Sequence, residues 1–386
     1  MPMNAHLSDE VVRLRDAILA FSTEKISPWG GLSTSTYFPH EIWNEMGRQG
    51  FHGIAVPRKY GGAGFGYTGV FVAGMALVEA GNCLGFALSW LMNQLVAGSL
   101  FATFGSYAQK DRYLEALAQG KLIGALAVSE PGHGSHPKYL ETDARKERDA
   151  YVISGKKTYI TNGPIAGVYV VVAVSGNRGR EKAFMAFIVP RDTPGLKVGE
   201  PLDLGFLRPC PHGGILLDAC RVPAHAVLGS VGDAYRDMIV PFGEIEDVLM
   251  MGPVIGVMRA QLTVIRDFLG RDRSRVTDEI LNRLGTVHSL LHTLEGLAVE
   301  ACGNLDGSVK DTGLTELIIS SRHLVSQIAS ELDRVMSLAK LQPSTKYELL
   351  ARDLSMAASV AARITEIRRK KLGAALLSYR GDRIPD

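Results

Sequence analysis

The stretch AVSEPGHGSHPKYLET, residues 127–142, and the stretch GKKTYITNG, residues 155–163, decide the fold of this chain. Two glycines within SEPGHGS let backbone amides approach a ligand closely, and the hydroxyls of Ser129 and Ser135 can donate hydrogen bonds to it. A surface turn is the alternative interpretation of the same residues. The second stretch is predicted to be a strand, because its β-branched and aromatic run is typical of one.

Hydrophobic periodicity divides the rest of the chain into three parts. Up to about residue 120, apolar residues recur three or four apart, as in Leu7, Val11, Leu14, Ile18 and Phe21, and Ser8 or Asp9 can cap the first helix. Between residues 123 and 229, short β-branched runs alternate with Gly, Pro and Asn, which predicts an antiparallel β-domain and not βαβ units. Four long amphipathic segments then predict an up-down four-helix bundle: residues 238–269, 276–302, 312–339 and 346–377.

The fold class is therefore predicted as α+β with three domains. They are an N-terminal helical domain of residues 1–122, a middle β-domain of residues 123–232, and a C-terminal four-helix bundle of residues 233–386. The four glycines of VPRKYGGAGFG, residues 56–66, predict a loop. Because so short a connection joins two apolar helices, a shaped turn is favoured over a flexible connection.

Composition excludes several classes of protein. The 386 residues carry 42 Lys and Arg against 40 Asp and Glu, a net charge of +2, so a broad basic face for nucleic acid is not expected. No run of apolar residues approaches the roughly 18 that predict a membrane span. The four cysteines are scattered, which predicts buried thiols and neither disulfides nor a metal site. The N-terminus is too polar for a secretory signal, so we expect a cytoplasmic protein.

Four motifs in the correct order resemble the acyl-CoA dehydrogenase family of flavoproteins over nearly the whole chain. Residues 127–142 are similar to the family's TEPxxGSD loop, and residues 155–163 are similar to its KxWITN strand. VPRKYGGAGFG resembles the loop of the first domain, and DACRVPAHAVLG, residues 218–229, resembles the exit from the β-domain. The usual glycine signatures of Rossmann and P-loop nucleotide sites are missing from the β-rich part of the sequence.

The resemblance implies FAD as the cofactor and dehydrogenation of an acyl thioester across its α–β bond. A carboxylate takes the α-proton, and flavin N5 accepts the β-hydride. By the same resemblance, Ser129 faces the pyrimidine edge of the flavin and Ser135 reaches a phosphate or the pantetheine side of the substrate. Tyr159 takes the place of the aromatic residue, usually Trp, that covers the flavin, and Thr161 supplies a hydroxyl near N5. A tyrosine on a strand is otherwise usually a core residue.

The proton acceptor of most family members is missing. Their Glu belongs to an EGTxEIxR segment, and the similar segment here, AARITEIRRK, residues 361–370, has Ala362 in its place. In the isovaleryl-CoA dehydrogenase branch the base lies on the first helix of the C-terminal domain. FGEIEDVLMMGPVIG, residues 242–256, resembles that helix and offers Glu246 as the base, with Glu244 as the alternative.

The alternative interpretation of Glu246 is a solvated helix carboxylate without a catalytic role. Three acids lie within four residues, however, and a buried one among them would have its pKa raised toward a useful range. The backbone N–H of Ala362 is also a candidate donor to the thioester oxygen in this scheme.

Several residues depart from the family pattern. Asp247 follows Glu246 where the pattern has Arg, and His136 replaces the Asp of GSD. The RxxFG and QxxGGxGY segments, which in the family contact a neighbouring subunit's flavin, are not recognisable. Arg271, Arg273 and Gln342 are the residual candidates for those contacts.

The partners follow from the same resemblance. The acyl group can arrive as a CoA thioester or on the phosphopantetheine of an acyl carrier protein, and an electron-transfer flavoprotein or oxygen can re-oxidise the flavin. We expect a homodimer or homotetramer through the C-terminal helices, because residues such as Leu290, Leu291, Leu294 and Leu297 offer more apolar surface than one core absorbs. The competing hypothesis is a non-catalytic or flavin-poor relative that serves as an assembly subunit, supported by Ala362 and the altered adenine-side segments.

Overall fold

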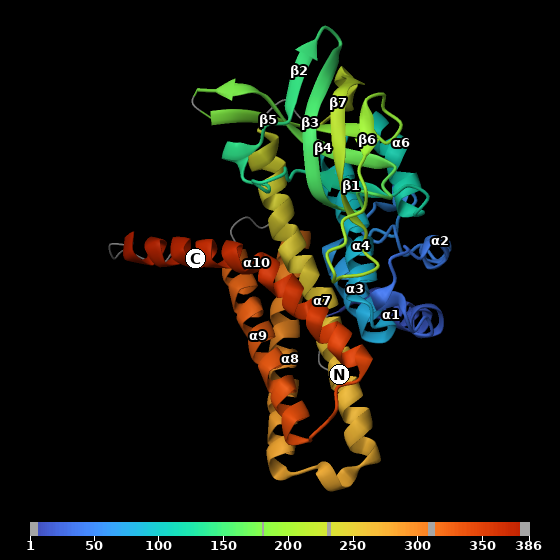
Figure 1. Ribbon diagram of the computed structural model, residues 1–386, viewed down its shortest axis with the longest axis vertical. Helices are drawn as coiled ribbons and strands as arrows, with labels where there is room; N and C mark the ends of the chain where they lie inside the picture. The colour runs from blue at the N-terminus through green and yellow to red at the C-terminus, as the bar shows by residue number, and fades with distance from the viewer. Residues whose placement is uncertain (1–6, 180, 230–232, 308–312, 379–386) are drawn as a thin grey trace.

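The computed structural model describes residues 7–179, 181–229, 233–307 and 313–378 (Figure 1). The sheet lies at one end of the molecule, and the long helices of the bundle extend away from it. Helices lead to the sheet, and helices follow it, so the α+β fold with a C-terminal four-helix bundle is confirmed.

The N-terminal part is helical. Its helices are α1 (Asp9–Phe21), α2 (His40–Arg48), α3 (Gly66–Gly81), α4 (Leu84–Leu95), α5 (Ala102–Phe104) and α6 (Tyr107–Ala118). The predicted cap of α1 is present, because the backbone N–H of Val11 donates to the Ser8 hydroxyl at 3.4 Å.

The sheet has the strands β1 (Gly124–Ala127), β2 (Asp143–Glu147), β3 (Ala150–Thr161), β4 (Val168–Arg178), β5 (Glu181–Pro190), β6 (Leu196–Val198), β7 (His212–Pro223) and β8 (Val227–Leu228). Their order is β6-β7-β3-β2-β4-β5-β8, with β1 also paired to β4. The prediction of a purely antiparallel sheet is wrong at two pairs, since β1 and β2 both run parallel to β4. The long loop between β1 and β2 returns the chain to the same side of β4 and permits this.

Strand β4 is buried on both faces. Val168, Val170 and Val172 join the core that the two helical parts share, whereas Tyr169 and Val171 belong to a separate core on the other face of the sheet. A strand with two buried faces reads as a continuous apolar run, as VYVVVAV does.

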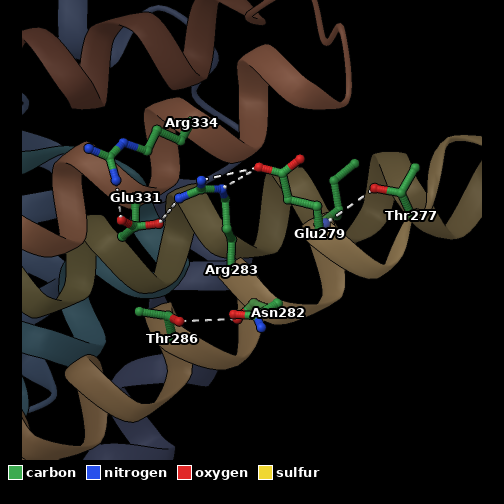
Figure 2. A network of polar contacts seen from close by, with 8 residues as sticks. Thr277, Glu279, Asn282, Arg283, Thr286, Glu331 and Arg334 are labelled. Atoms are coloured by element: carbon green, nitrogen blue, oxygen red, sulfur yellow. Dashed lines mark hydrogen bonds and ion pairs between the residues drawn. The ribbon is translucent and has the colours of Figure 1, made fainter.

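The C-terminal helices are α7 (Val240–Arg271), α8 (Asp278–Asp306), α9 (Leu314–Leu338) and α10 (Thr345–Ser378). Figure 1 shows α7 running from the sheet along the bundle, with α10 crossing it. On the outer side of α8 and α9, Arg283 lies between Glu279 of its own helix and Glu331 of α9, at 3.1 and 2.9 Å, and Arg334 reaches the other oxygen of Glu331 at 2.8 Å (Figure 2). These ion pairs are partly exposed, so each contributes little to the free energy of unfolding. The pair of Arg283 and Glu331 joins α8 to α9.

The leucines of α8 that motivated the prediction of an oligomer lie mostly within the chain's own core. Leu291 and Leu294 are buried, and Leu290 packs against the same core. That argument for a dimer is therefore wrong for these residues. The most exposed apolar side chains of the bundle, Leu376 and Leu377, lie on α10 together with the half-exposed Ile364 and Ile367, and Leu281 is an exposed leucine of α8.

Two helical stretches are long and apolar enough to cross a membrane by composition alone, Leu84–Phe104 and Tyr235–Arg271. Of their most apolar windows, 94% and 67% are buried inside the protein. Packing accounts for this apolar character, because α4 and α7 form the core where the domains meet.

Helices α3 and α7 approach so closely that α7 needs glycine at two contact points. A Cβ atom at Gly252 would lie 2.3 Å from the carbonyl oxygen of Phe71, and one at Gly256 would lie 2.5 Å from that of Met75. The GPVIG segment thus has a structural cause as well as a family resemblance. A second link comes from Asp306 at the end of α8, whose carboxylate accepts the backbone N–H groups of Tyr67 and Thr68 at 2.6 and 2.9 Å and caps α3.

We expect Gly256→Ala to lower the free energy of unfolding by about 1–3 kcal/mol, because the added methyl group collides with backbone and not with a movable side chain. Gly270→Ala is the matched control on the same helix, since no atom lies within 4 Å of the place that its Cβ would occupy. The control should be neutral or stabilising, as helix propensity predicts. Denaturant unfolding of the two variants measures this, and equal midpoints would contradict the close contact.

Candidate active site

A buried ion pair joins the two motifs that decided the fold. The Lys157 ammonium on β3 donates to the Glu130 carboxylate at 2.8 Å and to the Val128 carbonyl at 2.9 Å. The same carboxylate accepts the backbone N–H groups of Glu141 and Thr142 at 2.7 and 2.9 Å. Both side chains are almost fully buried. The Glu130 loop is therefore held at its start and at its end against β3.

The charge state of this pair follows from its contacts. Burial alone would raise the pKa of Glu130, but the hydrogen bonds from Lys157 and from the backbone amides outweigh it and lower that pKa. A further bond closes the contact, since the Thr158 N–H donates to the Ser129 carbonyl at 2.9 Å. Ser129 is thereby fixed beside the outward face of β3.

Irregular backbone on β3 presents Tyr159 to solvent. The pairing of β3 with β7 shifts register between Lys157 and Ile160, and Tyr159 has a φ of 54°. As a result its side chain is 62% exposed while that of Ile160 is buried. A tyrosine held in the left-handed region is strained, and such strain persists where the surrounding structure imposes it, often at ligand sites. The core interpretation of Tyr159 is therefore wrong.

The asparagine of the TYITN segment anchors the end of this strand. Asn162 is buried, and its side-chain amide donates to the Ser89 carbonyl of α4 at 2.8 Å while its amide oxygen accepts the Ser89 hydroxyl. These bonds tie the sheet to the helical part directly behind Tyr159 and Thr161.

A cavity of about 760 Å³ brings the predicted site residues together. Ser129, Ser135, Tyr159 and Thr161 line it from the sheet side, and Glu244 and Glu246 line it from α7. Further lining residues include Met92, Leu126, Tyr235, Phe242, Ile364, Ile367, Arg368, Lys371 and Leu372. The cavity thus lies between the sheet, α7 and α10.

Glu246 is an acidic residue of this cavity whose pKa is shifted from its usual value. Burial, with a smaller contribution from the neighbouring Asp247 carboxylate, raises the pKa of Glu246 to about 7. A carboxyl group with a pKa near neutrality is suited to proton transfer.

Asp247 itself turns away from the cavity and forms an ion triad. Its two carboxylate oxygens accept hydrogen bonds from the guanidinium groups of Arg322 on α9 and Arg368 on α10, each at 2.5 Å. Arg368 also lines the cavity, so the positive charge that the sequence lacks at position 247 is supplied from another helix. Sequence reasoning missed Arg368 and Lys371, because nothing in the sequence indicates which face of α10 meets α7.

Ala362 does not face this cavity. It lies within the continuous helix α10 and lines a second cavity of about 330 Å³, on the side of Asp247 and Ser321. The expectation that its backbone N–H serves the thioester oxygen is therefore wrong, since helical N–H groups at this position are bonded within the helix.

Arg271 and Gln342 are not brought to the cavity of their own chain. Both are exposed, at the end of α7 and in the connection between α9 and α10, and these connections lie at the end of the bundle away from the sheet (Figure 1). Because they were expected to contact a neighbour's flavin, their role stays a prediction. The four cysteines are buried, and among the described residues no three His, Cys, Asp or Glu side chains form a group that could hold a metal.

The cavity fits a planar aromatic cofactor. It pairs an exposed aromatic side chain, held by strained backbone, with hydroxyl donors at Ser129 and Thr161 on an anchored surface. Residues 8–121 match the acyl-CoA dehydrogenase N-terminal domain, and residues 125–220 match the acyl-CoA dehydrogenase middle domain. The chain belongs to the acyl-CoA dehydrogenase family.

Relatives extend the likeness beyond the two matched domains. The 2-methylacyl-CoA dehydrogenase of Solanum tuberosum is 28% identical over 97% of this chain and 92% of its own. An isovaleryl-CoA dehydrogenase of Oryza sativa is 33% identical over 66% of this chain and 63% of its own. The L-prolyl-[peptidyl-carrier protein] dehydrogenase of Pseudomonas fluorescens is 29% identical over 77% and 80%.

Solved structures share the fold. Butyryl-CoA dehydrogenase of Megasphaera elsdenii aligns with a TM-score of 0.84 and 20% identity over 96% of this chain and 99% of its own. PigA with FAD and proline aligns with a TM-score of 0.82 and 22% identity over 97% and 99%. The protein is accordingly an oxidoreductase acting on CH–CH bonds, with FAD as its cofactor.

We expect Glu130→Gln to destabilise the protein by about 3–5 kcal/mol, because it leaves the Lys157 ammonium buried without its counter-ion. The loop should loosen as well, so FAD should be lost more readily on dilution. Arg145→Met is the control, since it removes an exposed ion pair with Glu147 on neighbouring β2 and should cost no more than about 1 kcal/mol. Thermal unfolding and flavin absorbance after gel filtration measure both effects, and a Glu130→Gln protein as stable as the control would refute the anchoring role.

Proposed function

We propose that this enzyme removes hydrogen from the α and β carbons of an acyl thioester, with Glu246 as the acceptor of the α-proton. The observation that supports this most is the shared cavity. Glu246, whose pKa is raised to about 7, lines the same cavity as Ser129, Tyr159 and Thr161. Glu244 lines the same cavity and is the alternative base.

Each residue has a role in this proposal. FAD, when bound, supplies the hydride acceptor. Tyr159 covers the ring, and the hydroxyls of Ser129 and Thr161 donate hydrogen bonds to it. A carboxylate in a desolvated cavity is a stronger base than one in water, so Glu246 gains basicity from the same burial that raises its pKa. Arg368 and Lys371 add positive charge to the cavity wall, which favours the negative charge that develops on the thioester oxygen.

The substrate in this proposal is a thioester on a phosphopantetheine arm. Acyl-CoA is the first choice, as in the 2-methylacyl-CoA and isovaleryl-CoA relatives. A carrier-protein thioester is the second, supported by the prolyl-carrier relative, which aligns with 77% of this chain. An electron-transfer flavoprotein or oxygen re-oxidises the flavin.

We also propose a homodimer or homotetramer that covers α10. Leu376 and Leu377 are 78% and 89% exposed near its end, and Ile364 and Ile367 are about half exposed. The second hypothesis, a flavin-poor assembly subunit, is disfavoured by the intact anchoring of the two loops, which a scaffold does not need. A purified protein that stays colourless after FAD addition would favour it.

Glu246→Gln should leave FAD binding intact and slow flavin reduction by substrate by a factor of about 10² or more, because the amide keeps the shape and removes the basicity. Anaerobic stopped-flow absorbance of the flavin band, with a panel of acyl-CoA and carrier-bound thioesters, gives the rate. Glu244→Gln is the matched control, since it changes a second carboxylate of the same cavity. If the control loses as much as Glu246→Gln, or if Glu246→Gln is undiminished, the base is Glu244 or another group.

The rate of flavin reduction should rise with pH and level off above about 7, because only the ionised form of Glu246 accepts a proton and its pKa is raised to about 7. Asp247→Asn removes the negative charge that helps to raise this pKa, so the midpoint of the profile should move to lower pH. A midpoint that stays in place or moves to higher pH in Asp247→Asn would show that the titrating group is not Glu246.

A further inference from the structure

The second cavity, of about 330 Å³, lies between α7, α9 and α10 and has no part in the proposed function. Its volume is in the range of small-molecule sites in proteins. Among the described residues, it shares no lining residue with the cavity that Ser129, Tyr159 and Glu246 line, which we call the flavin cavity. On α10, Arg369 lines the second cavity, and Lys371, two residues further on, lines the flavin cavity. The two cavities are therefore separate.

One end of the second cavity is apolar. Along α7, away from the sheet, the lining changes from Asp247 to Met251 and Val254 (Figure 1). Val325 of α9 and Leu354 of α10 line the cavity as well, and Met251 and Leu354 are buried. Val254 stands two helical turns beyond Asp247, so this wall extends about 10 Å along α7. Because apolar surface is more stable when it is out of water, the wall suits an aliphatic chain.

The other end carries the charged lining residues, which are Asp247, Arg322 and Arg369. Asp247 accepts a hydrogen bond from Arg322 at 2.5 Å and another, at the same distance, from Arg368 on the side of the flavin cavity. These two arginines offset its negative charge. Among the described residues, the side chain of Arg369 takes part in no hydrogen bond or ion pair. A guanidinium group without an acidic partner suits a carboxylate, to which it can donate two parallel hydrogen bonds.

A buried hydroxyl group in the lining lacks a hydrogen-bond partner. Ser321 of α9 is 1% exposed and lines the second cavity, and its Oγ atom has no partner among the described residues. Most buried hydroxyl groups in proteins are hydrogen-bonded, because an unpaired one has lost its contacts with water without replacement. A carboxylate oxygen in the cavity can accept the Ser321 hydroxyl and remove this deficit.

The second cavity opens to solvent between α9 and α10. Ser326, Ala358 and Ala362 line it and are exposed, so small side chains stand at its opening. The segment that residues 361–370 resemble has Glu in place of Ala362, and a carboxylate at this position would repel an anion. With alanine here, the opening has neither a bulky side chain nor a negative charge.

We propose that the second cavity binds an aliphatic carboxylate, with the chain on the apolar wall and the carboxylate at Arg369 and the Ser321 hydroxyl. A free fatty acid of medium chain length belongs to this class of ligand. The site depends neither on the base of the flavin cavity nor on its substrate, because the two cavities have different lining residues.

Titration calorimetry on the FAD-loaded protein tests the proposal with three probes. Octanoate has the chain and the carboxylate, octylamine has the same chain with the opposite charge, and acetate has the carboxylate without the chain. Octanoate should bind once per chain, and at least about 10-fold more tightly than either of the other two, because only octanoate satisfies both ends of the cavity.

Two variants with matched controls locate the binding. Arg369→Gln should weaken octanoate binding by at least about 10-fold, whereas Lys371→Gln, which removes the same charge from the same helix at the flavin cavity, should not. Ala358→Phe should weaken it as well, because the ring fills the opening. Ser355→Phe is its control, since Ser355 is exposed on α10 and does not line the cavity. Unfolding midpoints and bound FAD should be equal in all four variants.

The proposal is overturned if octanoate does not bind measurably, or if octylamine or acetate binds as tightly as octanoate. It is also overturned if Arg369→Gln and Ala358→Phe bind octanoate as the wild type does. Loss of binding in Lys371→Gln, with binding kept in Arg369→Gln, would place the carboxylate in the flavin cavity and refute the separate site. A failure of the proposed function leaves all these titrations unchanged, because no thioester takes part in them.

Discussion

The buried pair of Lys157 and Glu130 is the contact on which the rest of the site depends. Two charges removed from water are stabilising only when their remaining hydrogen-bonding capacity is satisfied, and here two backbone amides and a carbonyl complete the set. The result is that a glycine-containing loop and a strand further along the chain become one rigid surface. Ser129 and Tyr159 line the same cavity on this surface.

Helix α7 combines a packing role with a chemical one. Gly252 and Gly256 let it lie against α3 at backbone contact, and this fixes the height and rotation of the turn that bears Glu246. Burial of that turn raises the pKa of Glu246 to about 7. The next residue, Asp247, binds Arg322 and Arg368 and so joins α7 to both α9 and α10.

The charges around the cavity have been rearranged in comparison with the motifs that the chain resembles. Ala362 has no carboxylate and faces the second cavity, and Asp247 stands where a cation is usual. Arg368 and Lys371 return positive charge to the cavity wall, and Glu244 and Glu246 supply acids from α7. The cation that the pattern places next to the base on α7 is thus replaced by cations of α10.

The sequence by itself determined the order of helices and strands and the two loops, and its resemblance to the family implied that Ser129, Ser135, Tyr159, Thr161 and Glu246 belong to one site. Periodicity, glycine spacing and motif order are local properties, so they can be recognised along the chain alone. Only the tertiary structure decided the parallel placement of β1, the outward side of Tyr159, the direction in which Ala362 points and the arrival of Arg368 in the cavity. The physical reason is that the side chains of a helix point in all directions around its axis. Which of these sides meets a neighbour is set by packing between elements that are distant in the chain.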